Sequence, residues 1–149
     1  MMRILFFILA LTGLIFAQDG IKDNERCKVR FDNGVVLKNV EAAVSSQKMA
    51  TGLSQREDIS DGMIFVFPEE DFLYFWMKDT LVDISIGFFD KEMTLLQVID
   101  MSANTLDIHK SNKKAKYALE LKKGSFEKLG IKAGDKIESL RCKNKWWKH

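Results

Sequence analysis

The sequence predicts a single, mainly β domain, a compact β-sandwich or barrel-like sheet with one or two short helices. Apolar residues recur at every second position in several segments, which is the periodicity of half-buried strands. These segments follow one another at short spacing, and turn-forming residues stand between them. Helical patterns are few and short, so packed or closed sheets are favoured over a helical architecture.

The amino-terminal part of the domain is predicted to be a β-hairpin. Cys27, Val29 and Phe31 alternate with charged residues, and residues 32–34 are Asp-Asn-Gly, a strong turn signal. Residues 35–44 are expected to continue as the second strand.

Further strands are predicted along the rest of the chain. Residues 63–67 are continuously apolar, and we expect Pro68 to end that strand because proline cannot donate to a ladder. Residues 82–88 alternate, and residues 93–99 return as their partner strand after a short polar turn. The same alternation recurs at residues 117–122.

Helix is expected in two short segments only. Residues 46–53 can form about two turns, and Ser125 can cap a shorter turn that Gly130 ends. Between Met101 and Lys116 lies a polar connection with the length and composition of a mobile surface loop.

The chain begins with the features of a secretory signal peptide. Arg3 precedes an apolar run over residues 4–16, which ends at Ala17 before polar sequence. The run is too short to cross about 30 Å of hydrocarbon as a helix, so cleavage after Ala17 is favoured over retention as an anchor. We therefore expect export to the periplasm or cell envelope. The expected organisation is a signal peptide at 1–17, a linker at 18–26, the domain at 27–142 and a tail at 143–149.

The two cysteines agree with export. Cys27 and Cys142 stand near opposite ends of the mature chain, with no third cysteine in the sequence to compete. In an oxidising compartment one such pair predicts one disulfide, and two separate buried thiols are the alternative. Neither His109 nor His149 stands at metal-ligand spacing from a cysteine, so no metal or other cofactor is expected.

Charge and motif content exclude some function classes. Lys and Arg number 23 and Asp and Glu number 21, which gives a formal net charge of +2. This balance supplies no global positive field, so nucleic acid is not an expected partner. The sequence contains no Gly-x-Ser-x-Gly elbow, phosphate loop or dinucleotide fingerprint, and we assign no catalytic residue from motifs.

A series of motifs occurs in a distinctive order. They are Gly-Leu at 52–53, Arg56, Gly-Met-Ile-Phe-Val-Phe at 62–67, Phe-Trp-Met-Lys-Asp-Thr-Leu at 75–81, Phe88 with Asp90, Tyr-Ala-Leu-Glu-Leu at 117–121 and a glycine-containing segment at 124–137. Together they resemble the domain-of-unknown-function family 192. The resemblance covers residues 29–137 and implies a compact, mostly β domain, often exported, without an agreed activity.

The chain departs from that family's usual pattern at several positions. Ser54 stands where the family usually has methionine, and Asp79 where it usually has asparagine. Ser85 stands where the family usually has an acid, with Asp83 two residues earlier on the same strand face. An acid that did chemistry in relatives would therefore be displaced in this chain.

Residues 75–80 are the best candidate for a functional edge. A tryptophan beside a lysine and an aspartate offers a flat apolar wall with a charged rim, as small-ligand sites do. The alternative is structural: Trp76 packs under a loop and Lys78 pairs with Asp79 or Asp83. We also expect Arg56 to hold one of the acids near this edge in a bidentate pair. The candidate ligand- or partner-binding residues are Trp76, Lys78, Asp79, Thr80, Arg56, Asp83 and Glu120.

The tail is a separate candidate surface. It combines basic residues with two tryptophans, a composition that suits an anionic membrane interface. Docking of the tryptophans on the domain is the alternative. The residues expected to contact a membrane are Lys145, Trp146, Trp147 and Lys148.

Two classes of function are open. The first is an exported, monomeric, non-catalytic module that binds a small ligand, an envelope polymer or an envelope protein around Trp76. The second is a hydrolase or transferase that uses Asp79, Asp83 or Glu120, and it would need two carboxyl groups with different pKa values at a defined separation. Carboxylates on the outer face of a sheet are usually solvated, so binding is favoured.

Overall fold

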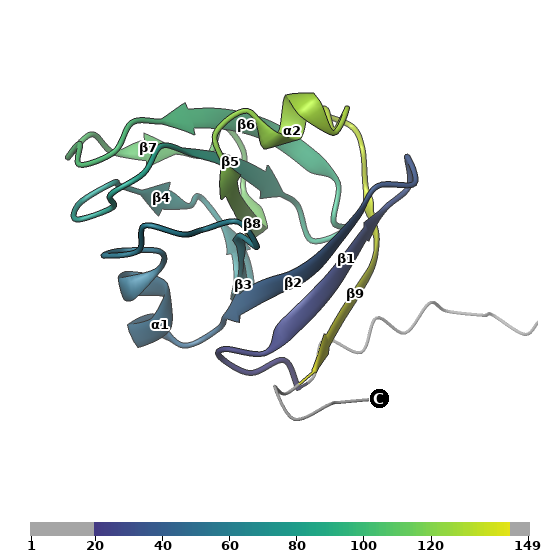
Figure 1. Ribbon diagram of the computed structural model, residues 1–149. Coiled ribbons are helices and arrows are strands. Elements are labelled where there is room, and N and C mark those ends of the chain that lie inside the picture. The colour runs from purple at the N-terminus through teal and green to yellow at the C-terminus, as the bar shows by residue number, and fades with distance from the viewer. Residues whose placement is uncertain (1–19, 144–149) are drawn as a thin grey trace, which may run out of the picture.

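The computed structural model describes residues 20–143 and confirms the mainly β prediction. Within this range, one large sheet of seven strands curls on itself, and a second sheet of two short strands lies beside it (Figure 1). None of the helices in this range is long and apolar enough to cross a membrane. The expected signal peptide and the tail residues Lys145, Trp146, Trp147 and Lys148 lie outside the described residues.

The large sheet has the spatial order β6-β5-β8-β3-β2-β1-β9. Its strands are β1 (Arg26–Phe31), β2 (Val36–Ala43), β3 (Met63–Asp71), β5 (Ile84–Phe89), β6 (Leu95–Met101), β8 (Ala115–Lys122) and β9 (Ile137–Lys143). The small sheet pairs β4 (Tyr74–Phe75) with β7 (His109–Lys110), and the helices are α1 (Ser46–Thr51) and α2 (Ser125–Lys128).

One strand pair in the large sheet is parallel. The predicted hairpin is confirmed, since β1 pairs with β2 in antiparallel fashion, but β2 then pairs with β3 in parallel. A parallel pair needs a crossover connection, and residues 44–62, which include α1, supply it. Ser45 begins α1 by accepting a hydrogen bond from the Lys48 amide on its side-chain oxygen, at 3.1 Å.

Two local predictions are wrong. Pro68 does not end a strand, because β3 continues to Asp71. The register between β3 and β8 shifts between Val66 and Asp71, and a residue without an N–H is tolerated where the ladder is irregular. Ser125 does not cap α2: Gly124 is the N-cap, with φ 80°, and the Ser125 hydroxyl donates to the Lys122 carbonyl.

The polar connection between residues 101 and 116 is not wholly a loop. It contains β7, whose His109 lies opposite Phe75 of β4. This pairing places the connection beside residues 72–75, so the small sheet forms a flap on one face of the large one (Figure 1).

Both faces of the large sheet are covered, and β8 shows how its residues divide. Tyr117 and Leu119 belong to one apolar cluster, together with Phe126 of α2. Ala118 belongs to the other, together with Leu53 and Met77 from the connections that cover the opposite face. Glu120 continues the alternation of Ala118, so its side chain falls on the face covered by the crossover connection and the flap.

The two edges of the curled sheet meet at one end. The Leu95 amide donates to the Asp135 carbonyl at 2.8 Å, and the Ile137 amide donates to the Met93 carbonyl at 2.9 Å. An isolated bridge joins Thr94 to Lys136 between these bonds. The start of β9 is thereby attached to the start of β6.

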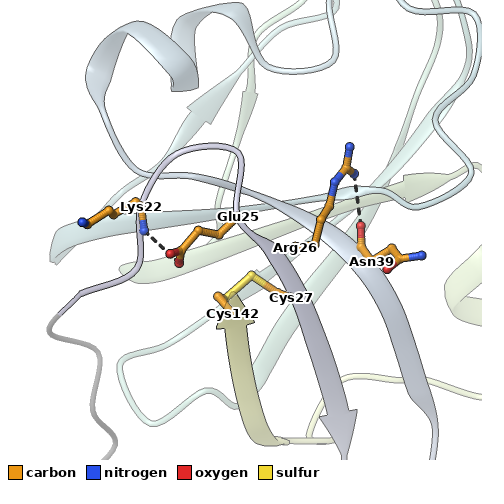
Figure 2. Close-up of a disulfide and its surroundings, with 6 residues drawn as sticks. All are labelled: Lys22, Glu25, Arg26, Cys27, Asn39 and Cys142. Atoms are coloured by element: carbon orange, nitrogen blue, oxygen red, sulfur yellow. Dashed lines mark hydrogen bonds between the residues drawn. A yellow bond between two sulfur atoms is a disulfide. The ribbon is translucent and has the colours of Figure 1, made fainter. Parts of the chain in front are cut away.

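The predicted disulfide between Cys27 and Cys142 is confirmed (Figure 2). The two cysteines lie directly opposite each other in the β1–β9 ladder, and 115 positions separate them in sequence. The bond therefore fastens an edge strand to its one strand neighbour in the large sheet.

We expect the double variant Cys27→Ala/Cys142→Ala to lose about 2–4 kcal/mol of unfolding free energy, because the bridge restricts the unfolded chain. Urea titrations with and without reductant measure the loss. Reductant should weaken the wild type to the level of the variant and leave the variant unchanged. Equal stability of the oxidised wild type and the variant would contradict the prediction.

Candidate ligand pocket

An aromatic pocket opens on the face of the sheet that carries α1 and the flap. Its volume is about 240 Å³, and it lies between the end of α1, β3, β4 and β8. The ring of Phe75 packs edge-on against Phe65 and Phe67, with centroid distances of 5.0 and 6.3 Å. Such contacts hold the rings in fixed orientations. The aromatic lining consists of Phe65, Phe67, Tyr74, Phe75 and Trp76.

Glu120 lines the same pocket from β8. The residue is only 5% exposed, which corrects the expectation that it lies solvated on an outer face. Its in-register neighbours, Met63 on β3 and Ile86 on β5, are apolar. Among the described residues its carboxyl group has no hydrogen-bond or ion-pair partner, and burial raises the pKa of Glu120 to about 8. The carboxyl group is therefore mainly protonated at neutral pH.

The rim brings together three more of the predicted site residues. Trp76 is half exposed and does not pack under a loop, and Thr80 is buried at the pocket wall. Within residues 20–143 Lys78 forms no ion pair with Asp79 or Asp83. Its ammonium group lies 5.4 Å from the centre of the Trp76 ring, within the range of a cation–π contact.

Asp79 contributes its backbone to the site. It has φ 55°, a left-handed conformation that asparagine and aspartate tolerate better than most residues. Its carbonyl accepts a hydrogen bond from the Gln55 amide at 2.9 Å and one from the Ser54 hydroxyl at 3.3 Å. Ser54 and Asp79, two of the departures from the family pattern, are thus in contact, and they join the two sides of the pocket.

Asp83 lies outside the pocket. Its carboxylate accepts a hydrogen bond from the Ala103 amide at 2.9 Å and faces the Lys123 ammonium group at 3.8 Å. It lines a different hollow, between residues 57–60 and 81–83. Asp83 therefore stabilises a connection between strands and does not face Glu120 across a common cavity.

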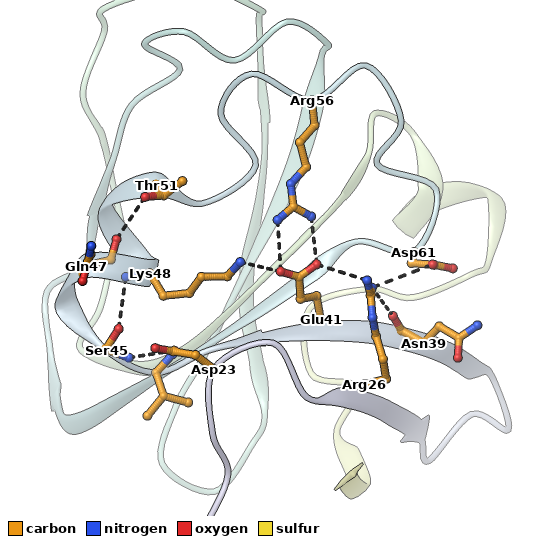
Figure 3. Close-up of polar contacts among 11 residues, drawn as sticks. Asp23, Arg26, Asn39, Glu41, Ser45, Gln47, Lys48, Thr51, Arg56 and Asp61 are labelled. Atoms are coloured by element: carbon orange, nitrogen blue, oxygen red, sulfur yellow. Dashed lines mark hydrogen bonds and ion pairs between the residues drawn. The ribbon is translucent and has the colours of Figure 1, made fainter. Parts of the chain in front are cut away.

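Arg56 forms the expected bidentate pair, but its partner is Glu41 (Figure 3). The two hydrogen bonds measure 2.8 and 3.0 Å, and Lys48 and Arg26 reach the same buried carboxylate. Hydrogen bonds from Arg56 are the main reason that the pKa of Glu41 is lowered to about 2. The prediction that Arg56 would hold Asp79, Asp83 or Glu120 is wrong.

Ser85 is buried and bonds to a carboxylate that the sequence did not single out. Its hydroxyl donates to Asp100, the residue directly opposite on β6, at 2.5 Å. It also accepts a hydrogen bond from the Gly124 amide at 2.9 Å. The acid nearest this position therefore comes from the neighbouring strand and not from Asp83.

Sequence reasoning missed several residues that shape the site. Glu41 had a usable signal, since it is a lone acid within the apolar run at residues 40–44. Phe67 and Tyr74 had none, because the sequence does not show that β3 and β4 wrap around Glu120. Within residues 20–143, no group of three His, Cys, Asp or Glu side chains is placed to hold a metal ion.

Comparisons with known proteins agree with the fold. The sequence profile of DUF192, described as "Uncharacterized ACR", matches residues 28–139. A protein of Sinorhizobium meliloti 1021, named as a candidate transcription regulator, has a crystal structure that is similar with a TM-score of 0.70 and 27% identity, covering 83% of this chain and 98% of its own. A protein of unknown function from Novosphingobium aromaticivorans DSM 12444 is similar with a TM-score of 0.69 and 26% identity, covering 78% and 83%. No curated protein was found to match.

We expect Glu120→Gln to remove a pH dependence of stability. In the wild type the unfolded carboxyl ionises near pH 4.5, whereas the folded one stays protonated to about pH 8. The unfolding free energy of the wild type should therefore fall as pH rises between these values, by on the order of 4 kcal/mol at pH 8, and the variant should keep that stability.

Urea unfolding of both proteins from pH 4 to pH 9 measures this difference. Asp83→Asn is the matched control, because it removes a half-exposed carboxylate that lies outside the pocket. Parallel pH profiles for the wild type and Glu120→Gln would contradict the assigned environment of Glu120.

Proposed function

Since the chain belongs to the DUF192 family, whose description assigns it no activity, we propose a function from its own geometry. The protein is an exported, non-catalytic module that binds a small ligand in the aromatic pocket. Trp76, Lys78, Thr80 and Glu120 contact the ligand, whereas Asp79 and Arg56 hold the surrounding backbone.

One observation carries this proposal. A buried polar group that is left without a partner costs about 1–3 kcal/mol, so folded proteins rarely keep one. Glu120 lines a pocket of about 240 Å³ together with aromatic side chains, and its carboxyl group has no hydrogen-bond or ion-pair partner among the described residues. An apolar pocket with a few convergent polar groups and a perturbed carboxyl is the usual form of a small-ligand site.

Export is the second part of the proposal. The apolar run at residues 4–16 after a basic start supports it, as does the Cys27–Cys142 disulfide, which suits an oxidising compartment.

A hydrolase or transferase is the competing function. Burial gives Glu120 a pKa that would suit a general acid. The other two candidate acids do not complete such a site, since Asp83 lines a separate hollow and Asp79 is not among the pocket-lining residues. The name of the Sinorhizobium protein also raises nucleic acid as a partner, which the net charge of +2 does not favour.

Ligand binding is tested by thermal-shift screening of the mature protein against amines, amino acids, saccharides and carboxylic acids. A ligand at a hundred times its dissociation constant should add about 2.7 kcal/mol of stability. Trp76→Ala should abolish the shift at little cost in stability, because Trp76 is half exposed. Leu129→Ala, an exposed apolar residue next to α2, is the control and should keep it. An unchanged shift in Trp76→Ala would place the ligand elsewhere.

Export is tested by expressing the full chain and a chain without residues 2–17 in a Gram-negative host. The full chain should appear in the periplasmic fraction with no thiol open to alkylation after denaturation. The shortened chain should stay in the cytoplasm with both thiols open. Recovery of the full chain from the cytoplasm with free thiols would contradict the proposal.

A further inference from the structure

The pocket floor carries a carboxyl group for which the described part of the protein supplies no counter-ion. Glu120 is nine-tenths buried or more, and apolar Met63 and Ile86 stand on the two neighbouring strands. An ionised carboxylate in such a place is stabilised only if an opposite charge comes close to it. The ligand is the available source of that charge.

The wall beside α1 is formed by the carboxyl-terminal end of that helix. The pocket is bordered by Met49, Ala50 and Thr51, the last residues of the helix, and by Gly52. The Lys48 and Thr51 carbonyls already accept hydrogen bonds from the Gly52 and Ser54 amides, which leaves those of Met49 and Ala50 among the last four carbonyl groups of the helix, and carbonyl oxygens accept hydrogen bonds but cannot donate them. A ligand that donates N–H groups, or that carries a diffuse positive charge, fits this lining better than an anion does.

The aromatic rim already holds cations. The ammonium group of Lys78 lies 5.4 Å from the centre of the Trp76 ring, and that of Lys110 lies 5.6 Å from the centre of the Tyr74 ring and 4.2 Å from that of Phe72. Tyr74 and Trp76 both line the pocket and are 61% and 50% exposed. The ring quadrupoles therefore already attract positive groups here, and the exposed part of each ring is accessible to a further one.

We propose that the pocket binds a small organic cation, a protonated or methylated amine, whose positive group lies against the aromatic wall and pairs with the Glu120 carboxylate. The inference rests on the proposed function of the pocket as a ligand site. It adds the chemical class of the ligand.

Binding of such a cation is coupled to loss of a proton. The free carboxyl group is protonated at neutral pH because burial raises the pKa of Glu120, and the cation stabilises the ionised form. One proton therefore leaves for each cation bound. Lys78 is the other charged residue in the pocket lining.

Other charged or titratable groups stand on the surrounding elements, and Lys110 of β7, which lies over the Tyr74 ring, is one of them. Lys48 of α1 is held by Glu41, and Lys122 lies two residues along β8. Asp79 follows Lys78, and His109 of β7 has a buried Nε2 atom without a partner among the described residues.

Three probes of similar shape and different charge test the inference: choline, its uncharged analogue 3,3-dimethylbutanol and the anion 3,3-dimethylbutyrate. Calorimetry on the mature protein should show that choline binds most tightly. Its affinity should rise about tenfold per pH unit up to about pH 8 and then level off. Titrations in buffers of different ionisation enthalpy should show release of one proton.

Two variants sharpen the test. Glu120→Gln keeps the shape of the side chain but cannot ionise. The variant should therefore bind choline at least about tenfold more weakly than the wild type and release no proton on binding. Asp83→Asn, which removes a carboxylate outside the pocket, should leave both unchanged. Thermal unfolding confirms that each variant is folded.

The outcomes separate this inference from the proposed function. If the alcohol or the carboxylate binds as tightly as choline and Trp76→Ala abolishes that binding, the cation inference is wrong and the ligand pocket stands. Binding of choline that is unaffected by Glu120→Gln also overturns the inference. If none of the three probes and no member of the wider panel binds, both are wrong.

Discussion

The ion cluster around Glu41 is the constraint on which the parallel strand pair and the pocket both depend. This buried carboxylate on β2 receives Arg56 from the crossover connection, Lys48 from α1 and Arg26 from β1 (Figure 3). Loss of one partner from a buried charge pair is strongly destabilising, because the remaining charge stays desolvated. The cluster therefore fixes the crossover connection against the sheet. That connection also forms one wall of the pocket that Glu120 lines. The ion cluster therefore holds this wall in place, although none of its four charged residues lines the pocket.

Two buried glutamates with opposite environments define the chemistry of this face. Arg56, with Lys48, lowers the pKa of Glu41 to about 2, whereas burial without a partner raises that of Glu120 to about 8. The first is permanently charged and structural. The second can gain or lose a proton near neutral pH, as functional carboxyl groups do. The sequence around them does not distinguish the two glutamates, because each is an acid in an apolar strand. The side chains packed around each carboxyl group in the fold do distinguish them.

The local sequence pattern was sufficient to predict where the strands lie, but not which strands pair in the sheet. Alternation of apolar and polar residues located β1, β5 and β8, because successive side chains of a half-buried strand point to opposite faces, and the turn signal at residues 32–34 located β2. No sequence pattern indicates that β2 pairs in parallel with β3. Without knowledge of that pairing, Arg56 could not be matched to Glu41, fifteen positions earlier. The site was predictable as far as Trp76, Lys78 and Thr80 belong to one segment. Glu120 joins these residues because β8 lies beside β3 in the sheet. Asp79 contributes its backbone because it adopts a left-handed conformation, with φ 55°.

The bridge between Thr94 and Lys136 bears on how the protein behaves at high concentration. An open sheet ends in two strands whose unpaired amides and carbonyls can recruit another chain, which is how edge-to-edge aggregation starts. Here the segment before β9 takes up hydrogen bonds of Met93 and Leu95 at the start of β6. Further along β9, Glu138 and Arg141 add charges to the exposed edge. A second copy that added a strand at this end would have to break the bonds that Met93 and Leu95 already make, so closure of the curl protects this part of the sheet edge.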